Sequence, residues 1–147
     1  MSKRSQGSRP AWLGATVNYR GAPLALRVSP RADSPARRRS FPYLVVLTHH
    51  LAKVRSNGLP DPGYNDTLAE FDATIISTLG RRGRGVSVLI ETLAGRRNYY
   101  AYTRSRVVGA KAFDDIRAQH PEQKLVFRGR TDPRWSVLER YRKEFSW

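Results

Sequence analysis

The chain has 147 residues and a mass of 16.7 kDa, with 27 Lys or Arg, 12 Asp or Glu and no Cys. A chain of this length buries roughly 70% of its unfolded surface, so we expect one domain over residues 11–147 after a basic, flexible segment at residues 1–10. Without Cys there are no disulfides, thiolate metal sites or Cys nucleophiles. No apolar run approaches the roughly 18 residues that span a membrane, and residues 1–10 lack the apolar stretch of a secretory signal. These features predict a cytoplasmic protein without membrane partners.

The formal net charge of +15 predicts attraction to acidic proteins and to polyanions. The excess is concentrated early, because residues 1–40 carry 9 Lys or Arg and a single acid, Asp33. Arg37, Arg38 and Arg39 end a Pro, Ser and Arg-rich stretch that has little apolar surface to bury. We therefore expect residues 29–40 to form a mobile loop. Such an arm is either solvated surface or a contact for nucleic acid or another anionic surface.

Alternating apolar residues predict strands over 15–19 and 24–28, joined in a β-hairpin by a turn around Arg20-Gly21-Ala22-Pro23. The continuous apolar run over 43–48 is typical of a strand covered on both faces, so we place it in the middle of a sheet.

Asp61-Pro62 is an N-cap followed by a proline at the first helical position, and a helix is predicted from there to residue 79. Its apolar positions share one helical face. A second hairpin is predicted over 86–91 and 98–103, then a helix over 107–119 and a short strand over 125–127. Asp132-Pro133 repeats the cap and proline pattern before a closing helix.

From residue 43 the predicted order is strand, helix, strand, strand, helix, strand, followed by the closing helix. This is the split βαβ arrangement of a ferredoxin-like α+β fold, preceded by an N-terminal β-hairpin. The first and third strands of this core lie in the centre of the sheet, and both helices cover one face. The other face is covered by the hairpin and the closing helix, or else it is open for binding.

Several motifs then carry a family resemblance. They are Phe41-Pro42-Tyr43-Leu44-Val45-Val46-Leu47-Thr48, Asn57-Gly58-Leu59-Pro60, Leu68-x-x-Phe71-Asp72, Asn98-Tyr99-Tyr100-Ala101-Tyr102-Thr103 and Asp132-Pro133-x-Trp135. Together they resemble the bacterial domain-of-unknown-function family numbered 695, over roughly residues 12–147. The resemblance implies a structural loop at Asn57, Gly58, Leu59 and Pro60. It also implies a binding or regulatory module without established chemistry, similar in fold to the regulator of ribonuclease activity B, which binds ribonuclease E.

Two further clusters of arginines are candidate contacts for an anion or a nucleic acid. Arg81, Arg82 and Arg84 lie among glycines after the predicted helix, whereas a phosphate-binding loop precedes its helix. We therefore favour a helix end followed by a flexible basic connection, with a loose contact to phosphate or to an RNA backbone as the alternative. Arg96 and Arg97 occupy the turn of the second hairpin. The two clusters should lie at opposite ends of the strand over 85–93, so they can form a stripe but not one pocket.

Tyr100 and Tyr102 fit the middle of the strand motif with which RNA-recognition domains stack bases, although the flanking residues do not fit. Tyrosines are also ordinary strand residues. His49, His50 and His120 lack the spacing of a metal site, and no Ser, His and Asp arrangement or carboxylate pair indicates catalysis. We therefore expect no catalytic residues, no metal and no cofactor.

The sequence thus predicts a non-enzymatic protein-interaction or regulatory module whose basic surface docks an acidic protein. One alternative is RNA or nucleic-acid binding through the arginines and strand tyrosines. Others are an immunity-type inhibitor of a toxin or nuclease and a small enzyme with an unrecognised site. A protein partner predicts an apolar patch rimmed by charge, a nucleic acid predicts a continuous positive stripe with exposed tyrosines, and an enzyme predicts a concave pocket with titratable groups turned inward.

Overall fold

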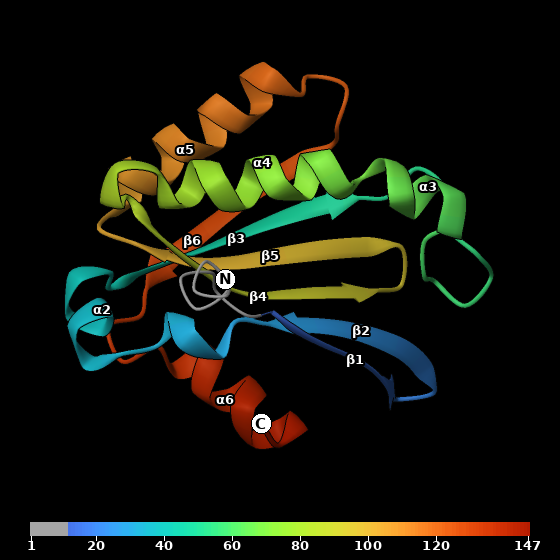
Figure 1. Cartoon of the computed structure of the whole chain (residues 1–147), viewed down its shortest axis with the longest axis horizontal. Helices are drawn as coiled ribbons and strands as arrows, with labels where there is room; N and C mark the ends of the chain where they lie inside the picture. The colour runs from blue at the N-terminus through green and yellow to red at the C-terminus, as the bar shows by residue number, and fades with distance from the viewer. Residues whose placement is uncertain (1–11) are drawn as a thin grey trace, which may run out of the picture.

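The computed structural model describes residues 12–147, so the predicted flexible segment at residues 1–10 lies outside the described residues. The fold is mixed α+β. Six antiparallel strands form one sheet in the order β1-β2-β4-β5-β3-β6. Helices α4 and α5 lie on one side of this sheet and α6 lies on the other (Figure 1). No helix in residues 12–147 is long and apolar enough to cross a membrane.

Strands β1 (Leu13–Tyr19) and β2 (Ala22–Val28) form the predicted hairpin. Arg20 and Gly21 both have positive φ, at 53° and 86°, as a two-residue turn matched to the strand twist requires. The side-chain oxygen of Asn18 accepts a hydrogen bond from the Gly21 N–H. The hairpin does not cover a face of the sheet: β2 pairs with β4 and the hairpin widens the sheet at its edge.

Strand β3 (Tyr43–His50) confirms the predicted central strand, because it pairs with β5 (Arg96–Thr103) on one side and β6 (Leu125–Thr131) on the other. Val45 and Leu47 point to the α4 and α5 side, and Leu44 and Val46 to the α6 side. Seven of its eight residues are buried, which explains the unbroken apolar run. Strand β4 (Gly85–Leu93) completes the second hairpin.

The helix predicted from Asp61-Pro62 is interrupted at Leu68, giving α3 (Pro62–Thr67) and α4 (Ala69–Gly80). The predicted cap is confirmed: the Asp61 carboxylate accepts a hydrogen bond from the Tyr64 N–H at 3.2 Å. The predicted apolar face of α4 packs on the sheet with α5 (Arg106–Gln119), through Phe71, Ile75 and Leu79.

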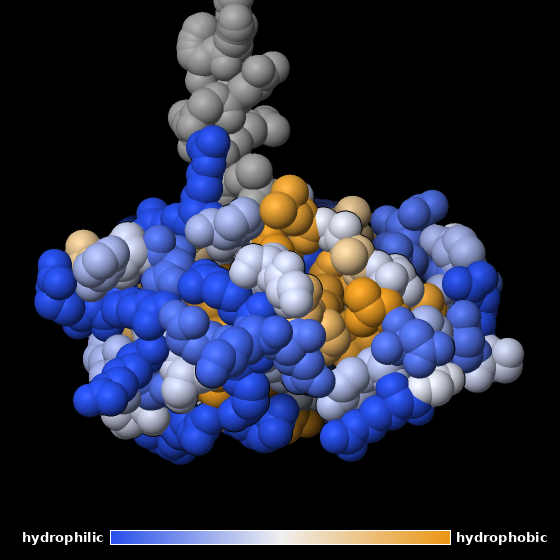
Figure 2. Space-filling model, turned by 90° about the horizontal axis from the view of Figure 1, so that it is seen from below, coloured by the Kyte–Doolittle hydropathy of each residue, from blue (hydrophilic) through white to orange (hydrophobic). Residues whose placement is uncertain are grey.

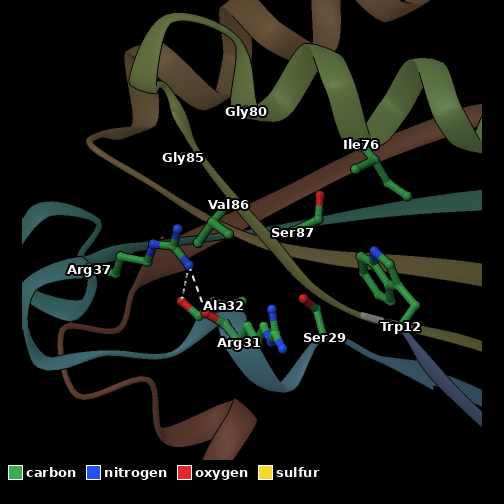
Figure 3. Close-up of a pocket in the computed structure, with 10 residues that line it drawn as sticks. All are labelled: Trp12, Ser29, Arg31, Ala32, Arg37, Ile76, Gly80, Gly85, Val86 and Ser87. Carbon is green, nitrogen blue, oxygen red and sulfur yellow. Dashed lines mark hydrogen bonds between the residues drawn. The ribbon is translucent and has the colours of Figure 1, made fainter. Parts of the chain in front are cut away.

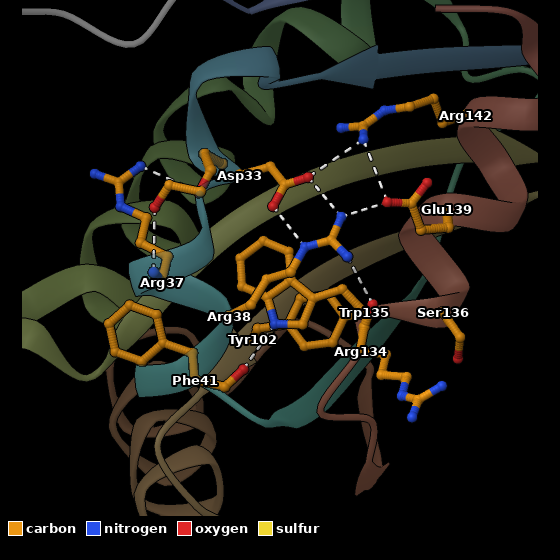
Figure 4. Close-up of polar contacts among 12 residues, drawn as sticks. Asp33, Arg37, Arg38, Phe41, Tyr102, Arg134, Trp135, Ser136, Glu139 and Arg142 are labelled. Atoms are coloured by element: carbon orange, nitrogen blue, oxygen red, sulfur yellow. Dashed lines mark hydrogen bonds and ion pairs between the residues drawn. The ribbon is translucent and has the colours of Figure 1, made fainter.

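The prediction of a loop over residues 29–40 is wrong. This segment forms the 3-10 turn η1 (Pro30–Ala32) and the helix α2 (Pro35–Ser40), whose first turn is capped by the Ser34 hydroxyl. Its contacts are both local and distant. Arg38 pairs with Asp33 five residues earlier, and it also binds Glu139 and lies over the ring of Trp135, about a hundred residues further along the chain (Figure 4). The composition argument overlooked Ser34-Pro35, a cap and proline pattern like Asp61-Pro62, and it could not include the distant partners.

The closing helix α6 (Ser136–Phe145) begins later than the Asp132-Pro133 pattern predicts, because Trp135 at its N-cap takes a left-handed conformation with φ 54°. Asp132 still caps the helix. Its carboxylate accepts hydrogen bonds from the N–H groups of Ser136 and Val137 at 2.9 and 3.2 Å, and from the buried Tyr102 hydroxyl at 2.7 Å. Asp132 therefore fixes α6 to the sheet.

Burial alone would raise the pKa of Asp132, but the hydrogen bonds from Ser136, Tyr102 and the helix N–H groups outweigh it and lower the pKa. A lowered carboxyl pKa stabilises the fold above the unfolded value of about 3.9, and that stabilisation disappears as pH falls through the folded value. We expect Asp132→Asn to lower the free energy of unfolding at pH 7 by about 1.5–3 kcal/mol. The difference from wild type should shrink below about pH 3.9.

Urea unfolding of both proteins between neutral and acidic pH measures this effect. Asp114→Asn is the matched control, since Asp114 is exposed on α5. An Asp132→Asn protein as stable as wild type at pH 7 would contradict the role given to Asp132.

Candidate functional site

Four of the eight predicted arginine contacts are used inside the fold. Arg97 is the most buried, with 8% of its side chain exposed, and it binds Asp72 at 3.1 Å and Asn65 at 2.7 Å. Arg84 pairs with Asp115 at 2.7 Å. Arg38 is held by Asp33 and Glu139, and Arg37 donates to two carbonyl oxygens of η1 (Figure 4). Much of the predicted basic surface is therefore structural.

The other four are Arg39, Arg81, Arg82 and Arg96, and all are exposed. Within residues 12–147, the side chains of Arg39, Arg82 and Arg96 make no hydrogen bond or ion pair. The Arg81 guanidinium makes one long contact, of 3.4 Å, to the Thr78 hydroxyl. Arg81 and Arg82 precede β4 and Arg96 follows it, so the structure separates them along the strand as expected. It does not bring the predicted set together in one site.

The two strand tyrosines have different environments. Tyr102 is fully buried and stacks on Trp135, with ring centroids 4.3 Å apart and planes 7° apart. Its ring is thus enclosed within the protein and has no open face for a base. Tyr100 is half-buried and donates a hydrogen bond to Glu91.

The segment Asn57-Gly58-Leu59-Pro60 folds against the turn of the second hairpin. The Gly58 carbonyl accepts from the Gly95 N–H at 2.8 Å, and the Asn57 side chain accepts from the Leu59 N–H at 3.0 Å. Gly58 has φ 89°, and a Cβ there would lie 2.8 Å from Ala94 Cα. Both constraints require glycine, which explains this segment as a structural loop.

The α6 side of the sheet, called the α6 face below, carries a hollow that the sequence did not predict. Helix α6 covers the end of this face near Tyr102, and beyond it lies an open space of about 460 Å³. We call it the Glu91 hollow; its lining residues are Thr48, His50, Glu91, Leu93, Arg96, Asn98, Tyr100, Val126 and Arg128. They come from β3, β4, β5 and β6, brought together by the register Thr48↔Asn98, Glu91↔Asn98 and Val46↔Arg128.

Glu91 forms the floor of the hollow. It is 8% exposed, and its carboxylate accepts hydrogen bonds from Asn98, Tyr100 and Tyr141 at 3.0, 2.9 and 2.8 Å. Burial and the nearby Glu91 charge raise the pKa of Tyr100 to about 12, and burial also raises the pKa of Tyr141. Both hydroxyls therefore stay protonated and keep donating, and the floor is a fully bonded network that fixes α6 to β4 and β5.

The rim of the hollow is cationic and partly apolar. Arg96, Arg128 and His50 are exposed, and their side chains make no hydrogen bond or ion pair within residues 12–147. Val126 is 46% exposed beside them, and Leu93 is partly buried. The hollow therefore presents unpaired cations next to accessible hydrocarbon.

A further apolar area lies on the α6 face at the edge strand β1. Leu13 is 55% exposed and pairs with Val28, and Val17 packs against the same apolar cluster as Leu93. Figure 2 shows this side of the molecule, with an orange apolar area bordered by blue hydrophilic side chains. An exposed apolar area beside charged groups is typical of a protein-binding surface.

Nothing in residues 12–147 brings three His, Cys, Asp or Glu side chains together as metal ligands. The adjacent histidines His49 and His50 lie in different environments. His49 is buried and forms a hydrogen bond with Gln123 at 2.8 Å, whereas His50 lies on the rim of the Glu91 hollow. Burial lowers the pKa of His49, so this ring is neutral at pH 7.

The chain matches a protein family over most of its length. The model of a family described as a family of unknown function, DUF695, matches residues 11–141. The chain belongs to the DUF695 family. No curated protein and no solved structure matches the chain of this DUF695 protein. The family confirms the resemblance carried by the strand and loop motifs.

Paired and unpaired arginines of this DUF695 protein should differ in their effect on stability. Arg97→Gln removes the cation from a buried pair and should lower the free energy of unfolding by about 3 kcal/mol. Its neighbour Arg96 is exposed, so Arg96→Gln should change the free energy of unfolding by less than about 0.5 kcal/mol. Urea unfolding at pH 7 measures both, and equal effects of the two substitutions would refute the division into structural and free arginines.

Proposed function

We propose that this DUF695 protein is a non-enzymatic interaction module that docks an acidic segment of a protein partner on the α6 face, at the Glu91 hollow. One observation carries the proposal: Arg96 and Arg128, which have no internal partner among the described residues, lie on the rim beside Leu93 and Val126. A docked segment would place carboxylates on the arginines and apolar side chains on the hydrocarbon.

The electrostatics favour an acidic occupant. The hollow contains two arginines and one carboxylate, and the Glu91 carboxylate already accepts hydrogen bonds from three donors. The whole chain carries a formal charge of +15, which attracts acidic partners and speeds their association. Guanidinium groups bind carboxylates in paired hydrogen bonds, so arginines suit this recognition better than lysines.

The apolar part of the rim favours a protein over a nucleic acid. RNA-recognition domains that stack bases present exposed aromatic rings on their central strands. Here Tyr102 is enclosed by Trp135, and the Tyr100 hydroxyl is bonded in the floor network. Four arginines of the predicted nucleic-acid set are bonded internally. These features support a protein partner and leave nucleic acid as an outcome of the test.

We also propose that residues 43–131 form a ferredoxin-like core. The order β6-β3-β5-β4, with α4 and α5 on one face, supports this arrangement. In it, the α6 face is the one that the core helices leave uncovered, and α6 covers only part of it. A cytoplasmic location agrees with the lack of cysteine. A regulatory inhibitor and an immunity-type protein are both compatible with such a module.

Site-specific photo-crosslinking in native cells tests the docking surface. A photoreactive amino acid replaces Val126, 46% exposed in the Glu91 hollow, and in a matched control it replaces Val107, 76% exposed on α5. We expect an adduct with one protein from position 126 only, and mass spectrometry should place the crosslink within an acidic segment. The double variant Arg96→Glu, Arg128→Glu should abolish it.

The proposal would be overturned by adducts with RNA from position 126, by equal adducts from both positions, or by no adduct from either. Retention of the protein adduct after both charge reversals would also overturn it. Thermal unfolding of the double variant checks that the fold is intact, as expected for exposed arginines.

A further inference from the structure

A second pocket lies on the opposite side of the sheet and serves no role in the proposed docking. It has a volume of about 280 Å³ and lies between the end of α4, the start of β4 and η1 (Figure 3). The residues used below are Trp12, Ser29, Arg31, Arg37, Ile76 and Ser87. From this pocket we infer a binding site for a small organic anion that carries an aromatic ring.

The strongest observation is an unbonded hydroxyl. Ser87 is 8% exposed and its hydroxyl has no hydrogen-bond partner within residues 12–147. A buried hydroxyl without a partner costs about 1–3 kcal/mol, so most such groups are bonded in native proteins. The sheet register shifts between Ser87 and Leu89, and such bulges often redirect side chains next to functional sites. A ligand oxygen in this pocket would supply the missing bond.

The charge of the pocket selects an anion. Arg31 and Arg37 line it, and no Asp or Glu does. Arg37 is held in place because one terminal nitrogen donates to the Arg31 and Ala32 carbonyls at 2.8 and 3.2 Å. Its other two nitrogens have no bond within the described residues. The end of α4 contributes roughly half a negative charge, which the two guanidinium groups outweigh.

The shape of the pocket selects a ring. Figure 3 shows Arg37 and Arg31 towards one end, Trp12 and Ile76 at the other, and the two serines between them. An indole and an aliphatic side chain bind a flat apolar group, while the serine hydroxyls and the arginines bind oxygen atoms. Ligand pockets are usually about 300–1,000 Å³, so this one suits a single-ring compound rather than a dinucleotide. Its oxyanion is a carboxylate or a phosphomonoester.

Four probes separate these requirements in the full-length protein. Phenyl phosphate and benzoate carry a ring and an anion, inorganic phosphate carries only the anion, and phenol carries only the ring. We expect phenyl phosphate or benzoate to bind roughly tenfold more tightly than either partial probe, equivalent to about 1.4 kcal/mol. The tighter of the two identifies the oxyanion. Amide and side-chain chemical shifts in NMR titrations should change at Ser29, Arg37 and Ser87.

Two variants test the residues. Ser87→Ala should weaken the tighter probe about fivefold or more, and Arg37→Gln about tenfold or more. Arg39→Gln is the matched control, since Arg39 is exposed on the same helix, α2, and does not line the pocket. Its affinity should equal that of wild type. Thermal unfolding should show all three variants folded, because none removes an apolar side chain from the core.

Several outcomes would overturn the inference. Equal binding of inorganic phosphate and phenyl phosphate would show an ion contact without ring recognition. Wild-type affinity in Ser87→Ala and Arg37→Gln, shifts spread over surface arginines, or no binding by any probe would each exclude the site. None of these results bears on the docking surface, because the Glu91 hollow lies on the other face.

Discussion

The arrangement of α6 on the sheet depends on the packing of Trp135 against Tyr102. The Trp135 ring is fully buried, stacks on Tyr102 and donates from its indole nitrogen to the Phe41 carbonyl at 2.8 Å (Figure 4). Burial of an aromatic side chain of this size contributes about 4 to 6 kcal/mol. The left-handed backbone at Trp135 turns the chain into α6, and Asp132 caps that helix. Without this anchor, the second face of the sheet would be uncovered along its whole length.

The position of α6 also decides which arginines are paired inside the fold and which remain exposed. Arg38 lies over Trp135 and pairs with Asp33 and Glu139. One positive charge of the Arg37-Arg38-Arg39 run therefore holds α2 against α6. Because α6 covers only one end of its face, the other end keeps Arg96 and Arg128 exposed above the Glu91 floor. The net charge of the chain therefore overstates the charge available to a partner. What matters for binding is which guanidinium groups lack an internal acid.

Elements with a strong local pattern could be predicted from the sequence. The apolar run of β3, the Asp61-Pro62 cap and the Arg20-Gly21 turn each depend on neighbouring residues alone. The helix over 35–40 has a local signal as well, the Ser34-Pro35 cap, which the charge and composition of the segment obscured, whereas the contacts of Arg38 with Glu139 and Trp135 could not be read from neighbouring residues. The Glu91 hollow was missed for a related reason: Glu91, Asn98 and Arg128 meet only through the register of four strands, which alternation within one strand does not fix. The enclosure of Tyr102 likewise required knowing where α6 packs.

The account depends on Arg96 and Arg128 serving a protein rather than a nucleic acid, and salt dependence separates the two most directly. Fluorescence anisotropy would compare a labelled peptide of alternating glutamate and leucine with a labelled single-stranded RNA at about 50 and about 200 mM salt. The account predicts that the peptide binds more tightly than the RNA at the higher salt, because apolar contacts are not screened, and that Arg96→Glu with Arg128→Glu removes this binding. Tighter binding of the RNA at about 200 mM salt, with the peptide unaffected by the charge reversals, would contradict it.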